Sequence, residues 1–176
     1  MGSLEDVLAH VTGLAAKRDA QLAEARTRVR VFLLGPGFPP PELDRRRRLK
    51  ERLTNRGIEA ILMEDIPQWQ STLSEKFRGI IEEMRPDVLI AIFTRHGSPL
   101  GVTFEIGYLT ATFGSEGLAK RLRYCLETAL DATKVMTAYV QEQVPMTSAA
   151  FFRDDEGLLR AVVNFVDNYN VGSGSS

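Results

Sequence analysis

One run of residues constrains the fold of this chain more than any other feature. Residues 87–94 read Asp-Val-Leu-Ile-Ala-Ile-Phe-Thr, and their apolar side chains are continuous rather than alternating with polar ones. A strand with one face in water alternates, whereas a strand covered on both faces is apolar throughout. The run therefore predicts a buried strand of a parallel sheet that has helices on both sides.

Strand-like and helix-like segments alternate along the rest of the chain. Short β-branched or apolar runs that predict strands cover residues 29–34, 58–63, 135–140 and 149–152. Apolar residues at helical spacing predict helices over residues 4–27, 42–56, 73–84, 102–113, 116–133 and 158–169. Such alternation is typical of right-handed βαβ units. We therefore expect an α/β fold of three layers: a flavodoxin-like (Rossmann-like) parallel sheet of about five strands, with an extra N-terminal helix.

The chain divides into three parts. Residues 1–28 are expected to form an amphipathic helix, residues 29–171 the α/β domain, and the Gly- and Ser-rich residues 172–176 a flexible tail. The N-terminal helix carries an apolar stripe from Leu4 to Leu22, although the α/β core does not require it. Because such a stripe must be covered, the helix either folds back on its own sheet or packs against another subunit.

Charge and cysteine content narrow the classes of function. The formal net charge is -1, which argues against a chain that coats nucleic acid or an acidic membrane. The single cysteine, Cys125, excludes an intramolecular disulfide and a paired metal–thiolate site, and it favours a reducing compartment. It lies at helical spacing among leucines, so we expect a buried, unreactive thiol on a helix.

Hydropathy gives no sign of a membrane segment. No stretch is apolar for long enough to cross a bilayer, and charged residues interrupt residues 1–25 in a way that a secretory signal does not allow. We expect a cytoplasmic protein with neither a membrane nor a nucleic acid as partner.

Side chains that can do chemistry follow the strand-like runs. In parallel sheets, ligands lie beyond the carboxyl ends of the strands. Three segments are expected to meet there: the loop 35–41, the pair Glu64 and Asp65, and the loop 95–101, which leads to Glu105. Glu105 falls in the first turn of the next predicted helix, where backbone N–H groups hold anions readily. The alternative is that Glu105 only caps or pairs at that helix N-terminus.

The stretch that contains Glu105 matches a known pattern. It reads Ser98-Pro-Leu-Gly-Val-Thr-Phe-Glu-Ile-Gly-Tyr108, with Gly101-x-x-x-Glu105-x-Gly107 after a buried strand. The first strand and its loop read Val31-Phe-Leu-Leu-Gly-Pro-Gly-Phe38. Both segments resemble the nucleoside 2-deoxyribosyltransferase superfamily, which includes the 2′-deoxynucleoside 5′-phosphate N-hydrolases, over roughly residues 29–113.

The resemblance implies cleavage of an N-glycosidic bond, by hydrolysis or transfer, on a nucleoside or nucleotide. It gives Glu105 the role of the catalytic carboxylate, which attacks the anomeric carbon of the sugar or stabilises the cationic transition state there. Ser98 and Gly101 match the loop that holds a 5′-hydroxyl or phosphate in relatives. The substrate-binding residues that it implies are Gly35, Pro36, Gly37, Phe38, Ser98, Gly101 and Tyr108. No metal and no bound cofactor are implied.

Two features leave the reaction open. Relatives carry a second acid on the helix before the third strand, whereas residues 76–79 contain none, and Glu75 and Glu82 are the nearest substitutes. The same architecture resembles TIR domains, some of which cleave the glycosidic bond of NAD with a single glutamate on the helix after the third strand. The alternatives are therefore a TIR-like NAD hydrolase, which acts on a dinucleotide, and a non-catalytic module that binds or senses nucleotides.

Three other features lie near the expected crevice. Four consecutive arginines, Arg45–Arg48, point all round a helix, so we interpret them as a solvated face, with one arginine near enough to steer a phosphate. His96 is expected to be exposed in its loop, and Trp69 to pack against the core.

The resemblance also bears on assembly. Relatives form homo-oligomers whose pockets border the subunit interface, which implies a homodimer or a larger symmetric assembly. The apolar stripe of the N-terminal helix is the expected contact.

Overall fold

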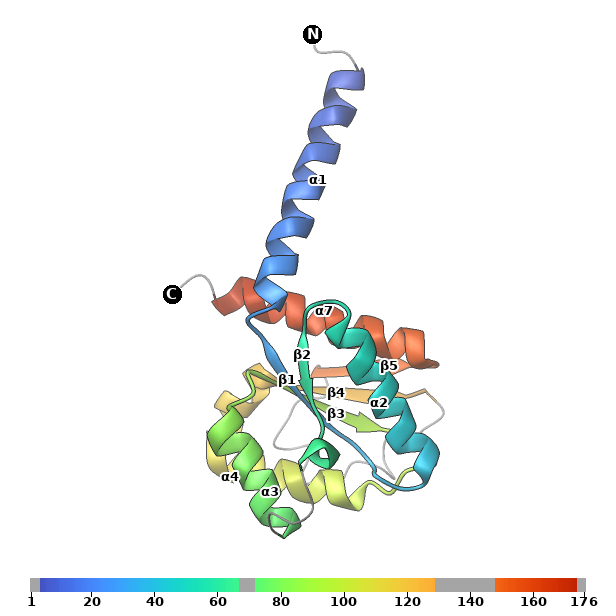
Figure 1. Cartoon of the computed structure of the whole chain (residues 1–176), viewed down its shortest axis with the longest axis vertical. Coiled ribbons are helices and arrows are strands. Elements are labelled where there is room, and N and C mark those ends of the chain that lie inside the picture. Colours follow the sequence, from blue (N-terminus) through green and yellow to red (C-terminus); the bar gives the residue numbers. More distant parts are fainter. Residues whose placement is uncertain (1–3, 67–71, 129–147, 174–176) are drawn as a thin grey trace.

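A five-stranded parallel sheet forms the centre of the molecule, as Figure 1 shows. The computed structural model describes residues 4–66, 72–128 and 148–173. The strands are β1 (Arg30–Leu34), β2 (Glu59–Ile61), β3 (Val88–Phe93), β4 (Leu122–Glu127) and β5 (Ala149–Phe152). Their order across the sheet is β2-β1-β3-β4-β5, and each neighbouring pair is parallel. This order confirms the predicted flavodoxin-like arrangement.

β3 is the central strand, as its apolar run predicts. All 6 of its residues are buried. Leu89 and Phe93 face one layer of the core, whereas Ile90 and Ile92 face the other. β1 pairs with one edge of β3 and β4 with the other. Because neither face nor edge meets water, apolar side chains occupy every position.

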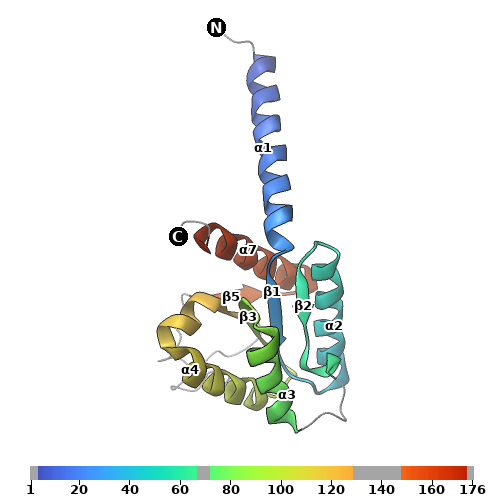
Figure 2. The ribbon, with the colours of Figure 1, turned by 60° about the vertical axis from the view of Figure 1, so that its left-hand side comes forward.

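Helices cover both faces of the sheet (Figure 2). The helices on one face are α2 (Pro40–Thr54) and α7 (Asp155–Ser173), and those on the other are α3 (Leu73–Gly79), its π-helical continuation η3 (Ile80–Met84) and α4 (Leu100–Arg121). A short 3-10 turn, η1 (Met63–Asp65), follows β2. Apolar stripes such as Leu49 and Leu53 on α2 form the buried side of each helix. The three layers therefore follow from the helical periodicity of the sequence.

The predicted helix over residues 116–133 is wrong for residues 122–127, whereas residues 116–121 are helical and residues 129–133 lie outside the described residues. α4 runs to Arg121, with non-helical geometry at Gly114, and the chain then enters β4. Tyr124 and Leu126 face one layer of the core and Cys125 faces the other. A strand buried on both faces has apolar residues at every spacing, so its pattern also fits a helix. Cys125 is buried as expected, but on a strand.

Some predictions fall outside the described residues. These are the predicted strand over residues 135–140 and the predicted packing of Trp69. The strand that pairs with β3 on the side away from β1 is β4. α7 includes residues 172 and 173, which the sequence assigned to the tail. Within the described part of the chain, no helix combines the length and the apolar character that crossing a membrane requires.

The first helix, α1 (Leu4–Arg26), extends away from the sheet (Figures 1 and 2). Its last residue, Arg26, forms a two-pronged ion pair with Asp167 of α7, at 2.7 and 2.8 Å. Towards its start, Val7, Leu8 and Val11 are more than half exposed. The helix thus touches the α/β body at one end, and most of its apolar stripe is uncovered within this chain.

Candidate functional site

A cavity of about 580 Å³ lies at the carboxyl ends of β1 and β3, where the fold places ligand sites. The loop after β1 forms one wall, and the loop after β3 with the first turns of α4 forms another. The residues that line it are Phe32, Leu33, Leu34, Gly35, Pro36, Gly37, Phe38, Pro39, Arg46, Met63, Glu64, His96, Ser98, Gly101, Val102 and Glu105. The volume is in the range of small-molecule sites.

Two glycines let the walls approach closely. A Cβ atom on Gly97 would lie 2.1 Å from Cγ of Pro36, so the loop after β3 touches the loop after β1 where only glycine fits. A Cβ atom on Gly35 would lie 2.7 Å from Cδ of Arg46. Both distances are shorter than any real carbon–carbon contact between non-bonded atoms. Packing between the loops therefore fixes the shape of the cavity.

An ion pair between a buried arginine and a partly exposed glutamate underlies the loop after β1. The side chain of Arg46, on α2, is only 3% exposed and donates from both terminal nitrogens to Glu64, at 2.6 and 3.2 Å. It also donates to the backbone carbonyl of Pro36, at 3.2 Å. Its buried Nε has no partner among the described residues. Arg46 thus joins helix, loop and η1 at the bottom of the cavity.

Glu105 enters the cavity from α4. Since α4 begins at Leu100, Glu105 lies in the second turn, beyond the free N–H groups of the helix start. Its carboxylate makes no hydrogen bond or ion pair within the part of the chain that the structure describes. Among the described residues, Glu105 therefore neither caps the N-terminus of α4 nor forms an ion pair there, so that alternative is wrong.

Burial changes the acidity of Glu105. Loss of solvent raises the pKa of its carboxyl group from an ordinary 4.5 to about 7. The positive charge of Arg46 lowers this pKa, and the negative charge of Glu64 raises it. Near neutral pH, protonated and ionised forms of Glu105 therefore coexist, which suits a group that takes part in chemistry.

The cavity brings most of the predicted residues together. Gly35, Pro36, Gly37 and Phe38 line one side, and Ser98 and Gly101 lie with Glu105 on the other. Tyr108 does not line the cavity, because its ring packs edge-on against Phe77 in the core, with 5.3 Å between the ring centroids. Ser98 and His96 are exposed at the rim.

The interpretation of the arginine run as a solvated face is wrong for two of its members. Arg46 is buried at the cavity, and Arg45 contacts three acids: Glu42 at 3.4 Å, Glu127 at 3.7 Å and Asp155 at 3.0 Å. Arg47 remains exposed, as expected. Four consecutive residues point in four directions, and only the packing of α2 decides which of them is covered. The close contact between Gly35 and Arg46, which only a glycine allows, could not have been predicted from the sequence.

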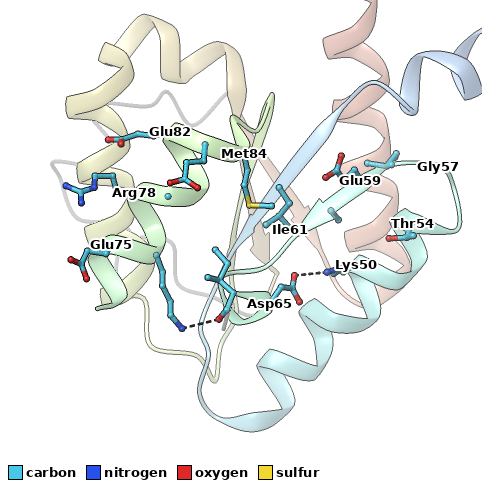
Figure 3. Close-up of a pocket in the computed structure, with 16 residues that line it drawn as sticks. Lys50, Thr54, Gly57, Glu59, Ile61, Asp65, Glu75, Arg78, Glu82 and Met84 are labelled. Carbon is cyan, nitrogen blue, oxygen red and sulfur yellow. Dashed lines mark hydrogen bonds and ion pairs between the residues drawn. The ribbon is translucent and has the colours of Figure 1, made fainter. Parts of the chain in front are cut away.

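A second cavity, of about 1330 Å³, lies beside the edge strand β2, between α2 and α3 (Figure 3). Its charged side chains are paired or lie in water. Lys50 bonds Asp65 at 2.6 Å, and Lys76 donates to the backbone carbonyl of Ile66 at 3.1 Å. Size alone does not make this groove a candidate site, since it holds no isolated, desolvated group among the described residues.

The described residues contain no cluster of three or more His, Cys, Asp or Glu side chains that is arranged to hold a metal ion. The polar groups that line the cavity are the side chains of Arg46, Glu64, His96, Ser98 and Glu105 and the backbone of the two loops.

Comparisons with known proteins agree with the architecture. No family model matches the chain, and no curated protein resembles it in sequence. A solved 2-deoxyribosyltransferase from the psychrotolerant bacterium Bacillus psychrosaccharolyticus superposes with a TM-score of 0.50 at 14% identity, over 77% of this chain and 96% of that one. The constitutive lysine decarboxylase of E. coli gives a TM-score of 0.45 at 14% identity, over 82% of this chain and 18% of that one. At this identity the first match shows the fold alone: this chain shares the three-layer α/β architecture of a 2-deoxyribosyltransferase.

Proposed function

We propose that this protein cleaves the N-glycosidic bond of a nucleoside or nucleotide, by hydrolysis or by transfer to an acceptor. The observation that carries the proposal is Glu105, an unpaired carboxylate in a cavity at the carboxyl ends of the strands. The fold shared with a 2-deoxyribosyltransferase supports the choice of bond.

The chemistry follows from the charges in the cavity. Ionised Glu105 attacks the anomeric carbon as the carbon–nitrogen bond breaks, and the bonding electrons leave with the base, which gains a proton from solvent. Water then releases the sugar from the ester in hydrolysis, or a second base does so in transfer. The transition state is positively charged at the sugar, so nearby carboxylates stabilise it.

Glu64 is the second carboxylate of this proposal. No acid stands at residues 76–79, but η1 brings Glu64 into the same cavity as Glu105. Its ion pair with Arg46 holds its carboxylate in place, and its side chain is 30% exposed. It thus offers a negative charge to the sugar, while Glu105 supplies the attacking oxygen.

The loops form the substrate cradle. The backbone of Gly35–Phe38 and of Gly101 contacts the substrate, with Ser98 at the open rim holding the 5′ end of the sugar. Tyr108 supports the cavity only through the core, since its ring contacts Phe77.

The test is product analysis by chromatography. Purified protein is incubated with a panel of 2′-deoxynucleosides, their 5′-monophosphates and NAD, with and without an acceptor base. We expect free base from a member of the deoxy panel. Release of nicotinamide from NAD alone would instead support the TIR-like alternative, and a ligand-induced rise in melting temperature without turnover would support a binding module.

The Glu105→Gln variant tests the assigned residue. It preserves shape and removes the charge, so base release should fall by at least about 10³-fold. Glu116→Gln, an exposed change on the same helix, is the matched control and should keep wild-type turnover. Wild-type turnover by Glu105→Gln would contradict the proposal.

A further inference from the structure

A buried carboxylate lies at the carboxyl end of β4, outside the set of residues that line the Glu105 cavity. It belongs to Glu127, the last residue of β4, the strand that lies beside β3 in the sheet (Figure 1). The side chain of Glu127 is only 8% exposed. Removing a carboxylate from water is unfavourable unless other groups bind it. The groups that bind Glu127 therefore indicate what this residue does in the protein.

The first partner of Glu127 is the backbone of the loop after β3. Oε2 of Glu127 accepts a hydrogen bond from the backbone N–H of Arg95, at 2.8 Å. Arg95 lies two residues beyond the end of β3, and its side chain is 57% exposed, with Nε 4.0 Å from Oε1 of Glu127. A hydrogen bond to a carboxylate is about twice as strong as one between neutral groups, whereas an exposed ion pair contributes little. Glu127 thus fixes the start of the loop through its backbone.

Arg45, on α2, supplies a positive charge beside Glu127. Its Nη1 lies 3.7 Å from Oε1 of Glu127 and 3.4 Å from Oε2 of Glu42. Nε of the same guanidinium donates to Asp155, the first residue of α7, at 3.0 Å. One arginine therefore joins α2, the end of β4 and the start of α7. Because these three elements are packed in the body of the protein, the acceptor for the N–H of Arg95 is held in a fixed place.

The loop that Glu127 holds is a wall of the Glu105 cavity. Two residues beyond Arg95 it reaches Gly97, where a Cβ atom would lie 2.1 Å from Cγ of Pro36. If Arg95 moved, Gly97 would separate from Pro36, and water would enter between the two loops. Loss of solvent is what raises the pKa of Glu105 to about 7, so water in the cavity would lower this pKa towards the ordinary 4.5.

We propose that Glu127 is a positioning residue of the Glu105 cavity: through the N–H of Arg95, it keeps the loop after β3 closed against the loop after β1. Glu127 does not line the cavity, so it acts on a substrate only through this loop. Its effect on base release rests on the proposed function, whereas its hold on the loop does not.

Two substitutions of Glu127 separate the reach of the side chain from its charge. Glu127→Gln keeps the length and an oxygen that can accept from Arg95, but it removes the negative charge. Glu127→Asp keeps the charge and is shorter by one methylene group, which moves the carboxylate about 1.5 Å away from the loop. Glu42→Gln is the matched control, since it changes another buried acid that contacts Arg45. Circular dichroism of all three variants checks that the α/β body stays folded.

Hydrogen exchange followed by NMR tests the hold on the loop. The amide of Arg95 should exchange slowly in the wild type and in Glu42→Gln. Glu127→Asp should speed this exchange by about tenfold or more, because it breaks a hydrogen bond to a charged group, and Glu127→Gln should speed it less. Equal exchange of this amide in the wild type and in Glu127→Asp would overturn the proposal. Faster exchange in Glu127→Gln than in Glu127→Asp would also overturn it, since charge rather than reach would then matter.

Titration of Glu105 tests the effect on the cavity and needs no substrate. Arg46 from α2 and Glu64 from η1 act on the charge of Glu105, and His96 lies at the rim of the same cavity. Glu127→Asp changes none of these groups. The pKa of Glu105, followed by carbon-13 NMR of its side chain, should therefore fall below the wild-type value in Glu127→Asp through hydration and stay unchanged in the control. An unchanged pKa in Glu127→Asp would refute the role of Glu127 in closing the loop.

Base release is a separate readout. Because the ionised form of Glu105 attacks in the proposed reaction, the rise of kcat with pH should move to lower pH in Glu127→Asp, by the same amount as the pKa of Glu105. Base release with the same pH profile in Glu127→Asp and the wild type would refute the role of Glu127 alone. A protein that releases no base from any member of the panel would refute the proposed function alone, since hydrogen exchange and titration would still decide whether Glu127 holds the loop.

Discussion

Two cavities among the described residues differ in how far water reaches the charged side chains that line them. The groove beside β2 is the larger of the two, at about 1330 Å³, but its acids lie near water, and Asp65 and Glu59 form ion pairs with Lys50 and Arg30. The cavity at the carboxyl ends of β1 and β3 measures about 580 Å³ and is lined by the unpaired Glu105 together with the ion pair of the buried Arg46 and Glu64. Desolvation, rather than size, distinguishes a reactive site from a surface groove.

The largest contrast is expected between two ion pairs. Arg46→Met removes two hydrogen bonds to Glu64 and the donor to the backbone carbonyl of Pro36, all made by a guanidinium that is itself buried. We expect a loss of about 3 kcal/mol in the free energy of unfolding, because hydrogen bonds from a charged group contribute about 1.5–3 kcal/mol each and are not fully additive. Lys50→Met breaks the Lys50–Asp65 pair in the groove, whose side chains are 33% and 39% exposed, and should cost less than about 1 kcal/mol. Urea denaturation measures both, and equal losses would remove the distinction between the cavities.

A second contrast concerns pH. The folded protein holds the proton of Glu105 up to a pKa of about 7, whereas the unfolded chain releases it near 4.5. Folding stability from this group is therefore fully present below pH 4.5 and is lost as the pH rises to 7, by up to about 3 kcal/mol. Glu105→Gln should thus stabilise the protein above pH 7 and have little effect at pH 4.5.

The control for this pH effect lies beside the groove. Glu59 pairs with Arg30 at the surface, where both side chains are about half exposed. Glu59→Gln should change the melting temperature little at either pH. Thermal melts at pH 4.5 and pH 8 compare the two variants. If the melting temperature of Glu105→Gln, relative to that of the wild type, were no higher at pH 8 than at pH 4.5, Glu105 would not be desolvated.

Replacing either of two glycines by alanine should change the free energy of unfolding by a smaller amount, with opposite signs at the two positions. Gly35→Ala drives a methyl group to within 2.7 Å of Cδ of Arg46, so we expect a loss of about 1–3 kcal/mol. Gly79 lines the groove on α3, and a Cβ there meets nothing within 4 Å. Gly79→Ala should therefore stabilise the protein by about 0.5–1 kcal/mol through helix propensity. Denaturation midpoints decide the signs, and a neutral Gly35→Ala would mean that the loop after β1 is not tightly packed.

The smallest effect is expected at the rim of the cavity. Ser98 is exposed two residues before α4 begins. Its hydroxyl and the helix start together favour an anion. Ser98→Ala should weaken binding of a 5′-monophosphate by about tenfold or less, and binding of the matching nucleoside by less than that. Calorimetric titration of both ligands measures the ratio, and equal losses would argue against a phosphate at Ser98.

Local patterns in the sequence determined the layers and the place of the cavity. The continuous apolar run of β3 requires cover on both faces, and the stripe on α2 supplies part of it. The loops after β1 and β3 then had to meet at one edge of a parallel sheet, with Glu105 beyond them. These conclusions hold because periodicity records which side chains leave water.

Tertiary packing decided what periodicity cannot record. Residues 122–127 fit a helix by spacing and form a strand because β3 offers an edge for pairing. Arg46 is buried and Arg47 is not, although both stand in one run of arginines. The pKa of Glu105 and the contact between Gly97 and Pro36 depend on segments far apart in the chain. Desolvation and close contact are properties of the assembled walls, so they exist only once the strands have placed those walls together.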